Sequence, residues 1–511
     1  MTSHILGAFA DIFQPMSFAF LFVGSALGLL VGVLPGLSSP MALAILIPIT
    51  FGMEPFSAFM ILIGIYVGTK TGGAFAAILI RTPGTPAAAA TAMEGFPMAQ
   101  RGEAGRALAI SIGSSFVGGT ISWMVAVPLV GVIGLYAVRI SSADLAMIGL
   151  MALAAVSSLS GRDLLKGLMS SCLGLILATV GLDELTGTPR LTLGYYQMLG
   201  GIPFLAAIVG LFAIATVLVD MSEEAVNAKP PTKRGGFNLV SLMRELWSMR
   251  KQLAVGTTIG SILGVVPGVG SDTAGWLSFA YVKRQIEKGF LKSDRKIGEG
   301  VPEGLAAPEA ANNAVTGGAT IPMLTLGIPG DGSTAIMLGA LMLFGLQPGP
   351  LFFRESPDMA YGILIALGVA NLTTLLAAVL LIRPFTAVLR IDRSMLLGSV
   401  LVLALAGSFA STNNTFEMMI ALSFGVLGYL MHRFGFSIPA LALGLILGPV
   451  IESNFRRALM ISRGDAMVFL TSPISLICII LLTLLAGKLL YDFVSKSKTQ
   501  SETQNNQPTK K

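Results

Sequence analysis

Charged side chains are scarce in this chain: they make up 12% of its 511 residues, against about 25% in a typical soluble domain. Hydrophobic residues account for 54%, and the mean hydropathy is +0.79. The composition excludes an ordinary soluble domain and indicates a membrane protein, because many apolar runs approach the ~20 residues that cross a bilayer. The net charge of +6 sits in loops between these runs, so no nucleic-acid partner is expected.

Cysteine and histidine are also rare, with two residues of each. Cys172 and Cys478 lie far apart inside apolar runs, so we expect them to pack rather than to form a disulfide. They cannot complete a metal cluster with His4 and His432, so no metal or cofactor is expected beyond a transported ion. The N-terminus lacks a basic region and a clear cleavage site, so no signal peptide is predicted.

Lysine and arginine are absent before Lys70, which places the N-terminus outside under the positive-inside rule. Five spans then bring the chain to a basic linker at 222–251, which should be cytoplasmic. These spans are expected near 56–70, 107–133, 143–160, 163–182 and 203–221.

The second half therefore begins inside where the first began outside, so two inverted repeats are predicted, at 1–221 and 252–491. Six spans return the chain to a polar cytoplasmic tail, 492–511. They are expected near 307–320, 357–382, 394–411, 416–432, 437–452 and 471–490. The predicted fold is an all-α polytopic membrane protein with about 11–12 transmembrane spans.

One short motif occurs twice, as GVLPGLSSP at 32–40 and as GVVPGVGSD at 264–272. Each copy interrupts an apolar run and is followed by a second broken run: GGAFAAILIRTPGT from Gly72 and GGATIPMLTLGIPGD from Gly317. We interpret them as re-entrant or broken helical hairpins, the typical position of the substrate site in secondary transporters. The alternative is that they are ordinary kinks and packing glycines.

A broken helix exposes free N–H groups at a half-helix N-terminus, which attract an anion such as a carboxylate. Small and hydroxylic residues follow each break and would let a substrate approach the backbone. The predicted substrate-binding residues are Pro35, Gly36, Ser38, Ser39, Arg81, Pro83, Gly84, Thr85, Pro267, Gly268, Gly270, Ser271, Pro329, Gly330 and Asp331.

Polar residues at membrane depth are candidates for coupling a cation, Na⁺ or H⁺. Asn312 and Asn313 could coordinate an ion or join helices, and Glu309 could take a proton or cap a helix start after Pro308. The predicted cation-coupling residues are Gly72, Gly73, Glu309, Asn312, Asn313, Gly317 and Gly318.

Three charged residues beside the breaks have two interpretations each. Asp331 and Asp272 could contact the substrate or cap a helix. Arg81 could pair with an anionic substrate or extend to the cytoplasmic face.

Several long motifs, in order, resemble the large membrane subunit of the tripartite tricarboxylate transporters, the TctA type. They are GVLPG, GIYVGTKTGGAFAAILIRTPGTPAAAATAMEGFPMAQRGEAGRAL, GLDELTGTPRLTLG, GVVPGVGSD, EGLAAPEAANNAVTGGATIPMLTLGIPGD, GLQPGPLFF and LGLILGPVIESNFRRALMISRGD. The resemblance runs from about residue 17 to 490. The chain departs from the family's pattern at Ser38, Arg81 and Asp331.

The resemblance implies a non-enzymatic permease subunit in the bacterial inner membrane. It would work with a small membrane subunit and a periplasmic solute-binding protein, and import tricarboxylates or related carboxylates with a cation, commonly Na⁺. Two alternative functions compete with this one: a carboxylate or anion channel, and an intramembrane aspartyl protease using Asp331 and Asp492.

Overall fold

The computed structural model describes residues 2–34, 36–50, 52–137, 140–159, 164–183, 185–222, 239–382, 393–410 and 413–487. Across these ranges the chain is helical, and its only strands form a small antiparallel pair, β1 (Gly181–Leu182) and β2 (Pro189–Arg190). Four predictions fall outside the described residues: Pro35, Asp492, the linker segment 223–238 and the tail 492–511.

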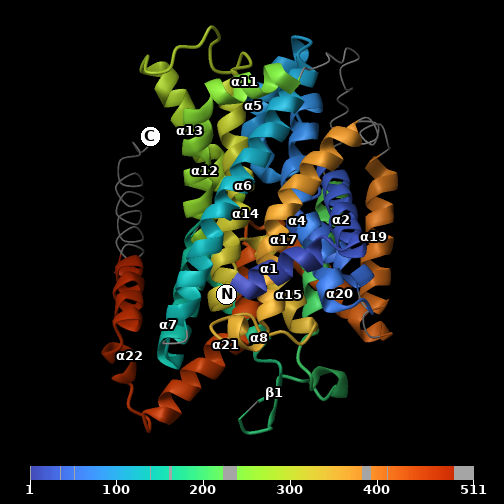
Figure 1. The fold of residues 1–511 in the computed structure, drawn as a ribbon. Coiled ribbons are helices and arrows are strands. Elements are labelled where there is room, and N and C mark those ends of the chain that lie inside the picture. The colour runs from blue at the N-terminus through green and yellow to red at the C-terminus, as the bar shows by residue number, and fades with distance from the viewer. Residues whose placement is uncertain are drawn as a thin grey trace, which may run out of the picture.

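The helices of the first half follow one another with short connections (Figure 1). They are α1 (Thr2–Ile12), α2 (Pro15–Val33), α3 (Ser39–Leu46), η1 (Ile47–Thr50), α4 (Pro55–Ile80), η2 (Pro86–Ala88), α5 (Ala89–Gln100), α6 (Ala104–Ala137), α7 (Ser142–Leu159), α8 (Leu164–Ala178), η3 (Tyr196–Met198), α9 (Phe204–Ile208), the π-helical turn η4 (Val209–Ile214) and α10 (Ala215–Ser222).

The second half repeats much of this order after α11, which forms within the predicted linker. Its helices are α11 (Leu239–Ser248), α12 (Arg250–Val265), α13 (Gly270–Glu287), α14 (Pro302–Leu326), α15 (Gly332–Leu343), α16 (Phe352–Glu355), α17 (Pro357–Leu380), α19 (Arg393–Ala410), α20 (Thr415–Arg433), α21 (Ile438–Ile461) and α22 (Val468–Thr471), followed by an apolar helix at Pro473–Gly487.

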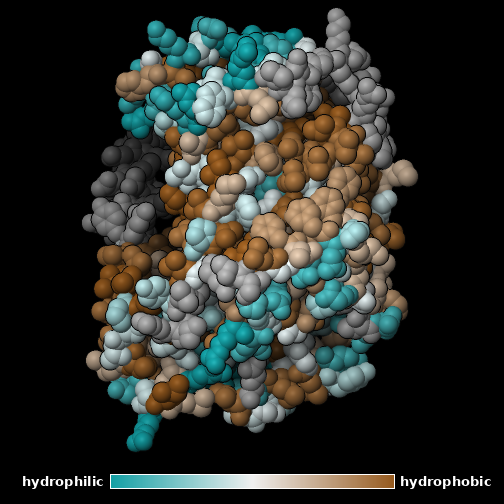
Figure 2. Space-filling model, viewed as in Figure 1, coloured by the Kyte–Doolittle hydropathy of each residue, from teal (hydrophilic) through white to brown (hydrophobic). Residues whose placement is uncertain are grey.

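Seven described helices are long and apolar enough to cross a membrane, which confirms a polytopic all-α membrane protein. They are Pro15–Val33, Pro55–Ile80, Ala104–Ile133, Phe204–Ser222, Pro357–Leu380, Thr415–Arg433 and Ile438–Ile461. Six shorter apolar helices accompany them. The count of 11–12 spans and the inverted orientation of the halves stay predictions. Figure 2 shows hydrophobic side chains in a broad band across the middle of one face, with hydrophilic ones gathered at the upper end.

Two helices are longer than the sequence predicts. α4 begins at Pro55, where Glu54 caps the backbone N–H groups of Phe56 and Ser57, and continues past Gly72 to Ile80. α14 likewise continues through Gly317 to Leu326. The expected span end at residue 70 is therefore wrong, and the glycine pairs are not the breaks. The chain leaves each helix only before the Pro-Gly pairs, through a residue in the left-handed conformation, Arg81 after α4 and Gly327 after α14.

A seam of glycines holds α2 against α4, and the same seam recurs between α12 and α14. Gly24, Gly28 and Gly32 rest on the backbone at Ile61, Ile65 and Thr69 of α4. Gly256, Gly260 and Gly264, at the equivalent positions of the second half, rest on Ala307, Ala311 and Val315 of α14. A Cβ at Gly260 would lie 2.9 Å from the Cα atom of Ala311, so only glycine permits this approach. The two halves are thus built on the same helix pair.

The halves are also packed into one another. α6 of the first half lies along α14 of the second, and α17 of the second half lies along α4 of the first (Figure 1). Polar contacts join the same helices: the Ser122 hydroxyl of α6 donates to the Ala314 carbonyl of α14 at 2.6 Å, and the Trp123 indole of α6 donates to the Leu364 carbonyl of α17 at 2.8 Å. These four helices therefore form a single central unit.

The loop that carries β1 and β2 extends from one end of the molecule (Figure 1). Asp183 anchors it: the backbone N–H of Thr186, the Arg456 guanidinium and the N–H of Leu185 hold the pKa of its carboxyl well below the usual range. Arg190 pairs with Glu452 at 2.7 Å. These arginines are therefore engaged in fixing the loop.

A buried carboxylate joins α5 to the segment before α14. Glu94 is fully buried and accepts the backbone N–H groups of Gly298, Gly300 and Val301 at 2.7, 2.9 and 2.8 Å. We expect Glu94→Gln to lower the free energy of unfolding by about 1–3 kcal/mol, because the amide nitrogen cannot accept these donors. The change in stability is measured by thermal unfolding of the purified chain. Glu299→Gln, at a carboxylate 49% exposed, is the control, and equal melting temperatures for both variants would contradict the assignment.

Candidate functional site

A cavity of about 510 Å³ lies where helix N-termini from both halves of the chain converge. Its volume falls within the ~300–1,000 Å³ of small-molecule sites. The lining includes Ser38 before α3, Thr85 before η2, Ser271 in the first turn of α13 and Asp331 before α15. Each lies just beyond one of the four breaks that the sequence predicts, so the structure brings all four breaks to one place.

Two of the four breaks are followed by a residue whose side chain caps the next helix. The Ser38 hydroxyl accepts from the Met41 backbone N–H at 3.3 Å. The Asp331 carboxylate accepts from the Thr334 N–H at 2.8 Å, and the Thr334 hydroxyl accepts in return from the Asp331 N–H at 2.9 Å. The expectation that Asp331 caps a helix is confirmed. Asp272 lies in the first turn of α13.

Glycine is required where the chain turns at a break and where a break lies against neighbouring backbone. Gly36 and Gly268, which are equivalent in the two copies of the motif, adopt φ values of +88° and +76°, a left-handed conformation that other residues rarely take. The Gly268 N–H donates to the Gly330 carbonyl at 2.8 Å, so the two breaks of the second half are bound to each other. A Cβ on Gly84 would collide with the Gly32 carbonyl, and one on Gly330 would collide with the Gly264 carbonyl.

The polar centre of the cavity is Lys70, which the sequence analysis did not identify as a site residue. Its ammonium donates to the Asp331 carboxylate at 3.0 Å and to the Ser271 hydroxyl at 2.8 Å, and it lies 5.5 Å from the centre of the Tyr66 ring. The side chains of Lys70 and Asp331 are 5% and 4% exposed. A lone lysine within an apolar run could have indicated a site residue, but Lys70 was predicted to be the end of the span 56–70.

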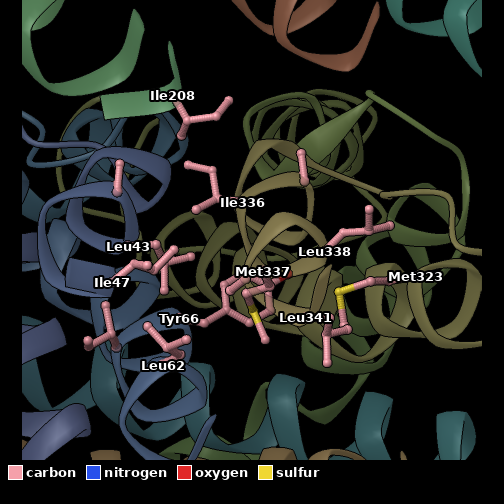
Figure 3. Packing of buried hydrophobic residues seen from close by; sticks show 14 of the residues in the cluster. Leu43, Ile47, Leu62, Tyr66, Ile208, Met323, Ile336, Met337, Leu338 and Leu341 are labelled. Carbon is pink, nitrogen blue, oxygen red and sulfur yellow. The ribbon is translucent and has the colours of Figure 1, made fainter. Parts of the chain in front are cut away.

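Apolar side chains pack around Tyr66, whose ring lies beside Lys70. Figure 3 shows Tyr66 of α4 pointing toward Met337 of α15, with Leu62, Leu43 and Ile47 nearby. All five are buried in the main hydrophobic core. The Tyr66 hydroxyl lies 3.4 Å from the Asp331 carboxylate. The Lys70–Asp331 pair therefore lies beside this core, and the low local dielectric strengthens the attraction between its two charges.

The predicted coupling residues on α14 mostly connect helices. The Asn312 amide donates to the Lys70 carbonyl at 3.0 Å, and the Thr71 hydroxyl donates to the Asn313 side chain at 3.1 Å. Glu309 is fully buried and accepts the hydroxyls of Thr91, Ser111 and Ser115. The expected helix start at Glu309 is wrong, because α14 already begins at Pro302. Of the predicted glycines, Gly72 and Gly318 belong to the seams, Gly317 faces Ser122 and Gly73 faces Thr85.

The predicted substrate residues divide into lining and supporting groups. Ser38, Ser39, Thr85, Gly268, Gly270, Ser271, Pro329 and Asp331 line the cavity. Gly36, Arg81, Pro83, Gly84, Pro267 and Gly330 are not among its lining residues. Arg81 ends α4 with φ +58° and stacks on the Phe96 ring at 5.8 Å, with its side chain exposed.

The cavity offers polar groups that remain free to bind a ligand. The buried hydroxyls of Thr85 and Ser333 have no hydrogen-bond partner within the described structure, and both residues line the cavity. Ser271 accepts from Lys70 and so keeps its own hydrogen for donation. Within the described ranges no group of histidine, cysteine, aspartate or glutamate could hold a metal ion. The arrangement suits a small anion with several oxygen atoms.

Comparisons with known proteins agree with this architecture. Residues 18–443 match the model of the tripartite tricarboxylate transporter TctA family. The chain is 35% identical, over 93% of both sequences, to the "uncharacterized 52.8 kDa protein in TAR-I ttuC' 3'region" of Agrobacterium vitis. It is 38% identical to the "uncharacterized protein in TAR-II ttuC' 3'region" of the same organism, over 43% of this chain and 93% of that protein. No solved structure matches the chain. The chain belongs to the tripartite tricarboxylate transporter TctA family, and is a multi-pass membrane protein of a transport system.

Proposed function

We propose that this chain is the large permease subunit of a tripartite secondary transporter that imports organic carboxylates by symport with a cation. The observation that carries the proposal is the cavity in which the Lys70 ammonium faces the starts of helices from both halves. A buried cation beside helix N-termini and free hydroxyls is the arrangement that recognises a carboxylate. Tricarboxylates and related carboxylates are the proposed substrates.

Membership of the TctA family supports the proposal of two partner proteins. The proposed complex contains a small membrane subunit and a solute-binding protein, which would deliver the carboxylate from the periplasm of a bacterium. The permease would then sit in the inner membrane. Close packing at two of the breaks favours alternating access over an open pore, because Gly84 and Gly330 each lie against the backbone of their own half.

The proposal is tested by uptake of labelled di- and tricarboxylates into proteoliposomes. They hold this chain and its small membrane partner, with the binding protein outside, and either a Na⁺ or a pH gradient is imposed. We expect concentrative uptake that requires both the binding protein and one of the gradients. A folded complex that takes up no carboxylate, or that conducts without a gradient, would contradict the proposed symport.

A further inference from the structure

We propose that Asp272 is the ligand for the monovalent cation that travels with the substrate, so that one cavity takes the carboxylate and its coupling cation together. This inference rests on the proposed symport function. It assigns the coupling cation to a residue that the sequence analysis did not include among its coupling candidates.

The charged residues of the cavity are not balanced. Three line it among the described residues: Lys70, Asp272 and Asp331. Lys70 and Asp331 neutralise each other at 3.0 Å, and Asp331 also accepts the backbone N–H and the hydroxyl of Thr334. Asp272 has no hydrogen bond or ion pair to another described residue, and its side chain is exposed to the cavity. The cavity lining therefore carries one unpaired negative charge.

The surroundings of Asp272 suit a small cation. Lys70 and Asp331 line the same cavity as Asp272 and pair with each other. Since these two neutralise each other, Asp272 keeps its attraction for a further positive charge. The free, buried hydroxyls of Thr85 and Ser333 line the same cavity, and hydroxyl and carboxylate oxygens are the ligands that hard cations prefer.

Charge balance then links the two ligands. A carboxylate that enters the cavity to meet Lys70 also meets the negative charge of Asp272. Two like charges in one cavity repel each other. A cation on Asp272, either Na⁺ or H⁺, removes this repulsion. Each ligand therefore strengthens the binding of the other, which is the requirement for coupled transport.

A structural role for Asp272 is the competing explanation, because an acid in the first turn stabilises a helix. Asp358 provides a control: it lies in the first turn of α17, its side chain is 84% exposed and contacts His4 at 2.8 Å, and it does not line the cavity. Asp358→Asn removes a first-turn acid without touching the proposed site.

The test compares uptake with and without the driving gradient in proteoliposomes of the complete complex. For the wild type the ratio of these rates should be at least tenfold in either the Na⁺ or the pH arm. We expect a ratio near one for Asp272→Asn, a retained ratio for Asp272→Glu, and the wild-type ratio for Asp358→Asn. An Asp272→Asn variant that keeps the wild-type ratio overturns the inference.

A binding measurement tests this inference separately from the proposed function. It also applies if the Asp272→Asn variant shows no measurable uptake. The melting temperature of the purified chain is recorded in sodium chloride and in choline chloride, each at two pH values. A cation- or pH-dependent shift present in the wild type and in Asp358→Asn but lost in Asp272→Asn supports the site. The same shift in all three overturns it. Absence of wild-type carboxylate uptake would contradict the proposed function instead.

Discussion

Replacing Lys70 by methionine is expected to reduce carboxylate uptake by about a hundredfold or more. The change removes the only cation that lines the cavity among the described residues, and leaves the Asp331 carboxylate buried without its ion pair. Removing one partner of a buried pair costs about 3–5 kcal/mol, which corresponds to roughly two to four orders of magnitude in an equilibrium. The measurement is initial uptake, normalised to the amount of correctly folded complex.

A second variant separates the ion pair's effect on folding from substrate recognition. Lys70→Met combined with Asp331→Asn removes both charges, so no unpaired charge stays buried. We expect this double variant to recover most of the melting temperature lost by Lys70→Met, but not the uptake, because the partner of the substrate carboxylate is still missing. Wild-type uptake by the double variant would show that Lys70 only holds the two halves together.

Lys166→Met is the matched control for the loss of a lysine. Its ammonium donates to the Phe434 carbonyl at 2.8 Å in an exposed position and lies 5.7 Å from the Phe436 ring. Like Lys70 it makes a polar contact and lies beside an aromatic ring, but it does not line the cavity. We expect its uptake to stay within twofold of the wild type.

The sequence predicted the breaks after the two long helices because proline and glycine act locally. Pro83 and Pro329 each follow a long apolar run, and the structure ends α4 and α14 before them. The repeat predicted that the breaks occur at matching places in two similar halves, and the structure adds that a residue beyond each break lines one cavity. The N-cap of α15 at Asp331 could also be predicted, because aspartate is a preferred N-cap residue.

The role of Lys70 could not be predicted, because the positive-inside rule treats a lysine after an apolar run as the end of a span. α4 in fact continues beyond Lys70 to Ile80, and the carboxylate that pairs with Lys70, that of Asp331, belongs to the other half of the chain. No pattern in the sequence around Lys70 indicates that pairing. Arg81 shows the opposite case: it stands beside a break in sequence, yet its side chain stacks on Phe96 and is exposed.

The second large effect is expected from the glycines that hold the breaks in contact. Gly84→Ala and Gly330→Ala should each reduce uptake at least tenfold. The added Cβ on Gly330 would lie 2.7 Å from the Cα of Ala319, and the Cβ on Gly84 would lie 2.9 Å from the Cα of Gly73. Both contacts are with backbone, so no side-chain rotation relieves them, and overpacking of this kind costs about 1–3 kcal/mol.

These two positions lie in different halves of the chain and make equivalent contacts, with Gly32 and Gly73 in one half and Gly264 and Ala319 in the other. If the halves use their breaks in the same way, the two variants should show similar losses of uptake. Gly398→Ala is the control, because no atom lies within 4 Å of an added Cβ there and alanine favours the helix. A large loss at only one of the two positions would mean that one hairpin carries the substrate while the other is a fixed support.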